Sequence, residues 1–164
     1  MNEISEDVRL AKNGDSEAFS RLYSTVYKDL YHIARYSLRS SEDASDAVSD
    51  AVLDAFCSIK KLRDPEKFRS WMLKILSSKI KHKQREYFKA EEAQQEGAEE
   101  GFDFESVELR EALGHIDSES RLLLSMSVLG GYTSDDIARI CNIKAGTVRS
   151  KLARIKEKLR LELA

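Results

Sequence analysis

The sequence has little that would interrupt a helix. Among its 164 residues there are one proline and seven glycines, the two residue types least compatible with a helix interior. Leu, Ala, Glu, Lys and Arg are abundant instead, and this composition favours an all-α fold. We therefore expect two small helical domains joined by an acidic, flexible linker.

Other absences exclude whole classes of protein. No apolar run is long enough to cross a bilayer, and the acidic, mixed N-terminus is unlike a secretory signal. The two cysteines, Cys57 and Cys141, form no CxxC motif, and three scattered histidines offer no metal site. We therefore expect a cytoplasmic protein with reduced thiols. Because no glycine-rich phosphate loop or nucleophile–base pair is present, we expect no catalytic residue, cofactor or small-molecule substrate.

The net charge of −2 hides a strong segregation of charge along the chain. Residues 42–54 contain five acidic side chains and no basic one, whereas residues 60–89 contain eleven basic side chains and three acidic ones. Residues 90–105 contain seven acids and no base, and residues 144–160 contain seven bases and one acid. The two basic segments are candidate surfaces for a polyanion.

Capping residues and the spacing of apolar residues divide the chain into expected helices. Helices are expected from Asp15 through Ile33, from Ser41 or Glu42 to about Lys60, and from Glu66 to about Phe88. Residues 90–105 lack an apolar period and read as the linker, which spans at most roughly 55 Å, the length of about 16 base pairs. We expect domains at 1–89 and 106–164. The second domain has expected helix starts at Ser106, at Asp117 or Ser118, at Thr133 and at Gly146.

The last two of these helices predict a helix-turn-helix. Thr133 and Asp136 stand at the spacing of a capping box at the start of the first helix. A short turn at 141–143 follows, in which Ile143 is expected to point into the core. One apolar stripe runs along the second helix and consists of Val148, Leu152, Ile155 and Leu159.

The opposite side of the second helix is basic, and a helix of this kind fits the major groove of DNA. Arg149 and Arg154 are the predicted base-reading residues, because arginine bonds guanine O6 and N7 in a bidentate way. Lysines and the backbone near Thr147 are expected to hold phosphates. The whole predicted set is Thr147, Arg149, Ser150, Lys151, Ala153 and Arg154. The alternative, a solvated basic helix, is disfavoured by the tight turn and by the asymmetry of the helix.

This segment resembles region four of sigma factors, which binds the −35 promoter element, and less closely the helix-turn-helix of response regulators. The N-terminal half separates the two, because a response regulator would begin with alternating strands and helices. It instead resembles region two of sigma factors of the extracytoplasmic-function type. The features that carry this resemblance are Glu42–Asp43–Ala44, Asp46, Val48, Leu53, Phe56, Leu62, Asp64–Pro65, Phe68, Trp71 and Ile75.

Four aspartates fall on one narrow face of the helix over residues 42–60, and we call them the acidic stripe: Asp43, Asp46, Asp50 and Asp54. Like charges on one face repel each other, so the stripe predicts a docking surface for a basic partner. An ordinary solvated face is the alternative. The resemblance implies that this helix binds the clamp helices of the β′ subunit of RNA polymerase, and that the C-terminal domain meets the β flap.

The next helix carries a basic row suited to phosphates or to a separated single strand. Together with the preceding loop it forms the predicted strand-opening surface: Lys61, Arg63, Asp64, Lys74, Ser78, Lys81 and Arg85. The resemblance implies that this surface opens the −10 element and that the loop holds a flipped base, which loses a few kcal/mol of stacking. Trp71 is expected to pack in the core, and a stacking platform for a base is the alternative. The family often has other residues at Ser49, Val52, Ser78 and His82, so no −10 sequence preference is implied.

We therefore expect a sigma factor whose partners are core RNA polymerase, promoter DNA and, by resemblance, an anti-sigma factor. One alternative is a stand-alone helix-turn-helix regulator whose N-terminal half dimerises or senses a signal. The linker is expected to act either as a passive tether or, as in the family, as a segment in the RNA path of the polymerase.

Overall fold

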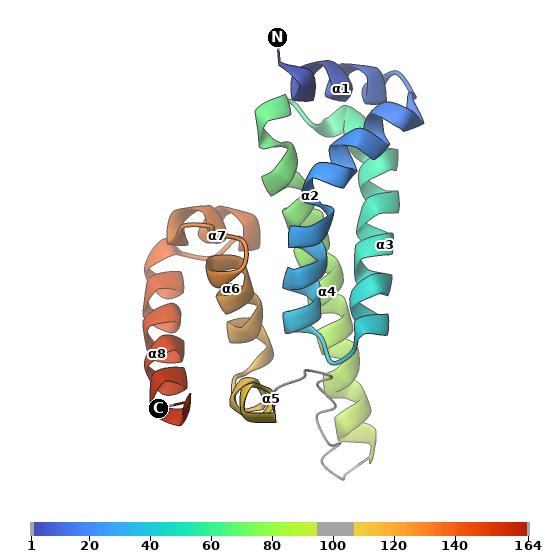
Figure 1. The fold of residues 1–164 in the computed structure, drawn as a ribbon. Coiled ribbons are helices and arrows are strands. Elements are labelled where there is room, and N and C mark those ends of the chain that lie inside the picture. Colours follow the sequence, from blue (N-terminus) through green and yellow to red (C-terminus); the bar gives the residue numbers. More distant parts are fainter. Residues whose placement is uncertain (1, 95–106, 164) are drawn as a thin grey trace.

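The structure, a computed structural model, describes residues 2–94 and 107–163. Within these residues the chain is helical and has no strand, which confirms the predicted all-α class. The N-terminal half consists of α1 (Glu3–Lys12), α2 (Ser16–Ser37), α3 (Ser41–Ser58), the 3-10 turns η1 (Ile59–Lys61) and η2 (Pro65–Lys67), and α4 (Phe68–Gln94). The C-terminal half consists of α5 (Val107–Gly114), α6 (Ser118–Val128), α7 (Ser134–Cys141) and α8 (Ala145–Leu163). Figure 1 shows the two halves side by side, with α3 and α8 on opposite flanks.

Side chains that accept backbone hydrogen bonds fix the starts of the helices. Asp15 caps α2 and Asp117 caps α6, as predicted. At α7 the Thr133 hydroxyl accepts a hydrogen bond from the backbone N–H of Asp136 at 3.1 Å. The Asp136 carboxylate accepts one from the Thr133 N–H at 3.4 Å, which completes the predicted capping box.

Small residues let α3 pack closely against its neighbours. Four alanines spaced along one face of the helix have no exposed surface: Ala44, Ala47, Ala51 and Ala55. This face packs against both α2 and α4. Because side chains three and four residues apart share a face of a helix, the opposite face of α3 is left to solvent. The acidic stripe lies at the edge of that exposed face that adjoins α4.

The N-terminal helix α1 was not predicted. Its cap is Asn2, whose side chain accepts a hydrogen bond from the Ser5 N–H at 2.8 Å. The Asn2 amide also donates to Glu66 at 3.0 Å and so ties the start of α1 to η2. Val8 and Ala11 are buried, so α1 closes one end of the N-terminal bundle.

Helix α4 continues past its predicted end near Phe88 and reaches Gln94. Glu91, on the extra segment, forms an ion pair with Arg39. The Arg39 guanidinium in turn lies 4.5 Å from the centre of the Tyr87 ring, and this cation–π contact holds it in position. The rest of the predicted linker, residues 95–105, and the predicted cap Ser106 lie outside the described residues.

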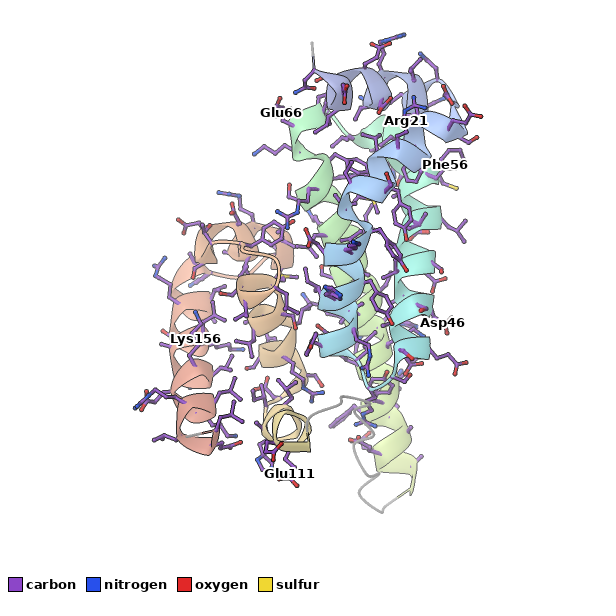
Figure 2. All side chains as sticks on the ribbon, in the orientation of Figure 1. Arg21, Asp46, Phe56, Glu66, Glu111 and Lys156 are labelled. Carbon is purple, nitrogen blue, oxygen red and sulfur yellow. The ribbon has the colours of Figure 1, made fainter. Side chains whose placement is uncertain are left out.

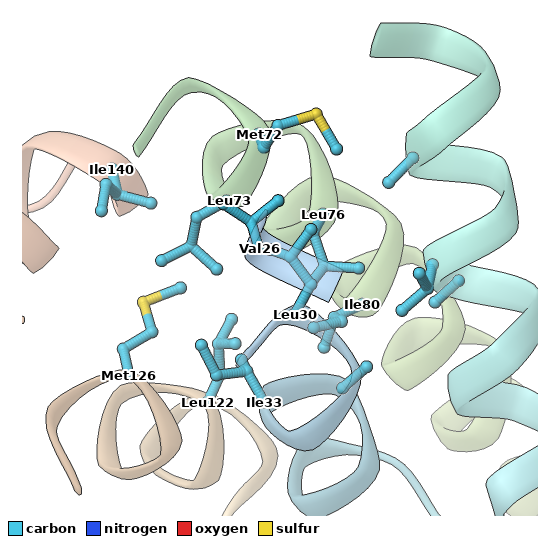
Figure 3. Packing of buried hydrophobic residues seen from close by; sticks show 14 of the residues in the cluster. Val26, Leu30, Ile33, Met72, Leu73, Leu76, Ile80, Leu122, Met126 and Ile140 are labelled. Carbon is cyan, nitrogen blue, oxygen red and sulfur yellow. The ribbon is translucent and has the colours of Figure 1, made fainter. Parts of the chain in front are cut away.

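One buried core runs through both halves. Helix α6 packs against α2, and α7 packs against α4. Leu122 and Met126 of α6 are completely buried, and Figure 3 shows them close to Ile33 of α2 and Leu73 of α4. The predicted boundaries at 1–89 and 106–164 remain a prediction, but the described parts of the two segments are in contact.

The turn between α7 and α8 requires a left-handed residue. Asn142 has a φ of +56°, a conformation that asparagine tolerates better than most residues. The Ile143 N–H donates to the Ala138 carbonyl at 3.0 Å, and the Ile143 side chain packs against the core as predicted. Helix α8 then turns Val148 and Leu152 inward and leaves its other face exposed.

Candidate polymerase and nucleic-acid interfaces

The outer face of α8 carries the residues predicted to contact the −35 element. Five of them are exposed, and Lys151 is partly buried; the exposed ones are Thr147, Arg149, Ser150, Ala153 and Arg154. Figure 2 shows Lys156 of the same helix on the flank of the molecule remote from Asp46 of α3. The exposed face is long enough to lie in a major groove.

Two of these cations have carboxylate partners. Arg149 Nη1 lies 3.6 Å from Asp135 Oδ1, and both side chains are more than half exposed. Such a pair contributes about 0–1 kcal/mol, so Arg149 is readily released to a base or phosphate. Lys151 Nζ lies 2.8 Å from Glu119 Oε2, and its side chain is only 26 % exposed. Lys151 is therefore held toward α6 more firmly than Arg149 is held toward α7.

The strand-opening surface lies along α4 and the loop before it. All of its members are exposed except Lys81, which is partly buried. None of its five cations forms an ion pair with a residue in the described ranges. Trp71 is partly buried, with its ring 6.2 Å from the Phe68 ring. It packs against the core and also lines a groove beside Lys61 and Lys74.

The acidic stripe is partly neutralised from α4. Asp54 pairs with Lys79 at 2.5 Å and Asp46 lies 3.8 Å from Lys83. Asp43 accepts a hydrogen bond from the Tyr87 hydroxyl. Burial raises the pKa of that hydroxyl, and the bond to the carboxylate raises it further. Asp50 is exposed and has no ion pair with any described residue, so it is the aspartate most available to a partner.

An exposed apolar patch beside the stripe was not predicted as a contact surface. Leu53 and Phe56 of α3 are 64 % and 38 % exposed, and Tyr27 of α2 is 44 % exposed. The Phe56 ring meets the Phe19 ring edge-on at 5.3 Å, which fixes its position. Leu53 lies one turn from Asp50 and so beside the stripe, and Phe56 lies one turn beyond Leu53, on the side of α3 that meets α2. Large apolar side chains beside charges are typical of a protein interface.

Both cysteines are free thiols, and they differ in surroundings. Cys57 is exposed, whereas Cys141 is buried with its sulfur 3.7 Å from the Met126 sulfur. Burial raises the pKa of the Cys141 thiol, which makes it a poor nucleophile.

Within residues 2–94 and 107–163, no cluster of His, Cys, Asp or Glu could hold a metal ion, and no helix is both long and apolar enough to cross a membrane.

Two family models match the chain in the order that the sequence predicts. Sigma-70 region 2 matches residues 22–92, and Sigma-70 region 4 matches residues 106–159. The chain belongs to the sigma-70 family. Only residues 93–105 separate the two matches, which is the organisation expected of the extracytoplasmic-function type. Sigma factors bind core RNA polymerase and promoter DNA through these regions, and in general they are initiation factors rather than enzymes.

Solved structures of sigma factors share the fold. The structure of CnrH in complex with the cytosolic domain of CnrY matches with a TM-score of 0.74 and 21 % identity over 99 % of this chain and 97 % of that one. The sigma factor RpoE of Bartonella quintana, in complex with the anti-sigma factor NepR, matches with a TM-score of 0.74 and 19 % identity over 88 % and 96 % of the two chains. No curated protein sequence matches the chain.

The matched regions divide the predicted residues cleanly. The acidic stripe, the apolar patch and the strand-opening surface all lie in the region 2 match, on α2, α3, α4 and the loop between the last two. The predicted −35 contacts all lie in the region 4 match, on α8. The roles of the individual residues stay predictions at this point.

Proposed function

We propose that this sigma factor docks on core RNA polymerase through α3 and holds promoter DNA through α4 and α8. The observation that carries the proposal is the exposure of oppositely charged surfaces on different flanks. Asp46 and Phe56 lie on the α3 flank, whereas Lys156 lies on the α8 flank (Figure 2). The stripe on α3 and the basic face of α8 are thus remote from each other, so the basic partner and the −35 DNA approach from different sides.

Docking on polymerase would use Asp50 together with the apolar patch. An exposed carboxylate steers a basic partner, but an isolated surface ion pair contributes only about 0–1 kcal/mol. Burial of a fully exposed Leu or Phe side chain contributes roughly 1.5–3 kcal/mol, and Leu53 and Phe56, which are 64 % and 38 % exposed, would contribute the corresponding part of it. We therefore assign most of the affinity to the patch, and the orientation of the complex to the stripe. The clamp helices of β′ are the proposed partner.

The −35 element would be read by α8. Arg149 and Arg154 are exposed on the face opposite Val148 and Leu152, where a major groove would lie against them. The −10 element would be opened on α4, where Lys74, Ser78, Lys81 and Arg85 follow one another along the helix. The loop with Lys61, Arg63 and Asp64 would receive the flipped base.

An anti-sigma factor is the further partner we propose, because the solved structures of RpoE and of CnrH each contain a bound second protein, which for RpoE is an anti-sigma factor. A protein that works on polymerase and promoter DNA acts in the cytoplasm, and we place this chain there.

Run-off transcription with purified core polymerase tests the proposal. The wild-type chain should give transcripts only from templates that carry its promoter. Asp46→Lys combined with Asp50→Lys should lower polymerase affinity at least tenfold, about 1.4 kcal/mol. The matched control reverses two exposed acids elsewhere, Glu3→Lys with Glu17→Lys, and should bind as the wild type does.

Two outcomes would contradict the assignment. Equal polymerase binding by both double variants would remove the docking role of the stripe. Sequence-specific duplex binding without any polymerase-dependent transcript would favour a stand-alone helix-turn-helix regulator.

A further inference from the structure

The loop that would receive the flipped base lies between two short turns, and α1 packs on both of them. We call residues 62–64, between η1 and η2, the base-receiving loop. We propose that α1 is a brace for this loop: it packs on η1 and η2 and holds Glu66 through Asn2, and so keeps the loop in the shape that takes up the base. The inference rests on the proposed role of the loop in −10 opening. Asn2 and Glu66 are then positioning residues, which act through the loop rather than on the DNA.

The turns on either side of the loop span three residues each. In η1 the Leu62 N–H donates to the Ile59 carbonyl at 3.1 Å. In η2 the Lys67 N–H donates to the Asp64 carbonyl at 2.9 Å. A 3-10 turn has poorer hydrogen-bond geometry than an α-helix, and one of this length gains nothing from cooperative extension. The shape of the loop therefore depends on what packs against the turns.

Helix α1 supplies that packing. It contacts α2, η1 and η2, and its Val8 and Ala11 are buried. Leu62, in the base-receiving loop itself, is buried in the same core. Asp7 of α1 pairs with Arg21 of α2 at 2.8 Å, which fixes α1 along the bundle. Because a close-packed core transmits displacements, a shift of α1 would move the loop as well.

Glu66 connects the loop to the start of α1. Its backbone N–H donates to the Asp64 carboxylate at 3.1 Å, and its side chain accepts a hydrogen bond from the Asn2 amide at 3.0 Å. Asn2 also caps α1 by accepting from the Ser5 N–H. One asparagine thus fixes the start of the helix and the position of η2 at the same time. Figure 2 shows Glu66 beside the N-terminal end of α1.

The brace leaves the side chains of the loop available to DNA. Arg63 and Asp64 are exposed, and so is Lys61 on η1. A loop that becomes ordered only on binding loses part of the binding free energy to its own ordering, and a flipped base has already lost its stacking. A loop that α1 holds in advance therefore takes up the base more tightly than the same loop without the brace.

The brace lies outside the part of the chain that the region 2 model matches. That match begins at residue 22, whereas α1 ends at Lys12. The members of the strand-opening surface all lie within the match. A segment that the family model does not cover thus acts on a site that it does cover.

Two substitutions at Glu66 separate the hydrogen bond from the charge. Glu66→Gln removes the negative charge but keeps an oxygen that accepts from Asn2, whereas Glu66→Ala removes both. Loss of an acid beside DNA strengthens binding by charge alone, and it does so equally in both variants. We therefore expect Glu66→Gln to open a promoter at least as well as the wild type, and Glu66→Ala to open it about threefold less. The permanganate reactivity of unpaired thymines in the complex with core polymerase measures the opening.

A double-mutant cycle tests whether the two residues act together. Asn2→Ser keeps a side chain that caps α1 but lacks the amide that donates to Glu66. It should reduce opening as much as Glu66→Ala does, and the double variant should reduce it no further, since the same bond is lost in all three. All variants should bind core polymerase as the wild type does and should melt within about 2 °C of it, because the bond is exposed.

The promoter supplies a readout that a merely structural role would not move. A scan of abasic nucleotides across the −10 element identifies the position at which loss of the base most reduces opening by the wild type. On a template that is abasic at that position, the wild type and Glu66→Ala should open equally, because the loop has no base to hold. At abasic positions elsewhere in the element, the deficit of Glu66→Ala should persist.

The outcomes separate the brace from the proposed function. If no abasic position reduces opening by the wild type, the loop receives no flipped base and its proposed role fails. If such a position exists and Glu66→Ala opens the intact promoter as well as Glu66→Gln does, only the brace is refuted. Additive losses in the double variant, or equal deficits on intact and abasic templates, would refute the brace as well.

Discussion

Truncating Leu122 should destabilise the N-terminal half, although Leu122 belongs to the C-terminal half. Its side chain is completely buried on α6 and lies against Ile33 of α2 (Figure 3). Leu→Ala at such a site costs about 2–5 kcal/mol, because the transfer free energy is lost and a cavity remains. With a urea m-value of about 2 kcal/mol per M, the unfolding midpoint should fall by about 1–2.5 M.

The single tryptophan makes the assay specific. Trp71 lies on α4 and lines a groove with α7, so its fluorescence reports the N-terminal half and its contact with α7, and circular dichroism reports all helices. With a shared core, both signals should shift together in Leu122→Ala. Leu22→Ala, buried on α2, is the positive control. Leu161→Ala, 66 % exposed on α8, should change stability by no more than about 0.5 kcal/mol. A Trp71 midpoint equal to that of the wild type would refute the shared core.

Two further predictions concern α7 and α8. Arg149→Ala should lose about 1–3 kcal/mol of binding at one base pair of the −35 element; a binding series over single-base variants measures this, and equal losses on all sequences would make Arg149 a phosphate contact. Thr133→Ala should cost about 1 kcal/mol in urea unfolding, while Thr133→Ser should stay close to the wild type. The hydrogen bond from Thr133 lowers the pKa of Asp136 in the folded chain. The stabilisation that this carboxylate provides is therefore complete above its unfolded pKa of about 3.9 and is lost as the pH falls through the lower folded pKa. Thr133→Ala should then show a weaker loss of stability below about pH 4.

Local signals in the sequence are enough to predict most of the helices. Asp15, Asp117 and Thr133 each cap a helix because a short polar side chain next to an apolar period satisfies free backbone N–H groups. Helix α1 has the same signals, since the Asn2 cap is followed by acids in the first turn and bases in the last. It was missed because few apolar residues mark its buried face.

The contacts between distant segments could not be predicted in the same way. The pairing of Lys79 with Asp54 and the approach of Lys83 to Asp46 depend on which faces of α3 and α4 meet. The packing of α6 on α2 depends on how the two halves fold against each other, and the charge pattern of the linker says nothing about that. The position of the Phe56 ring likewise depends on its contact with Phe19, a residue 37 positions earlier in the sequence.

The core that the two halves share also sets the free-energy cost of separating them. Separation would bring Ile33, Leu122 and Met126, all less than 2 % exposed, into water. Each such side chain carries roughly 1.5–3 kcal/mol of hydrophobic free energy. The shared core therefore favours the arrangement in which the two halves are in contact. A partner that keeps the halves apart has to cover these apolar side chains with its own surface, or bind elsewhere tightly enough to outweigh their hydration.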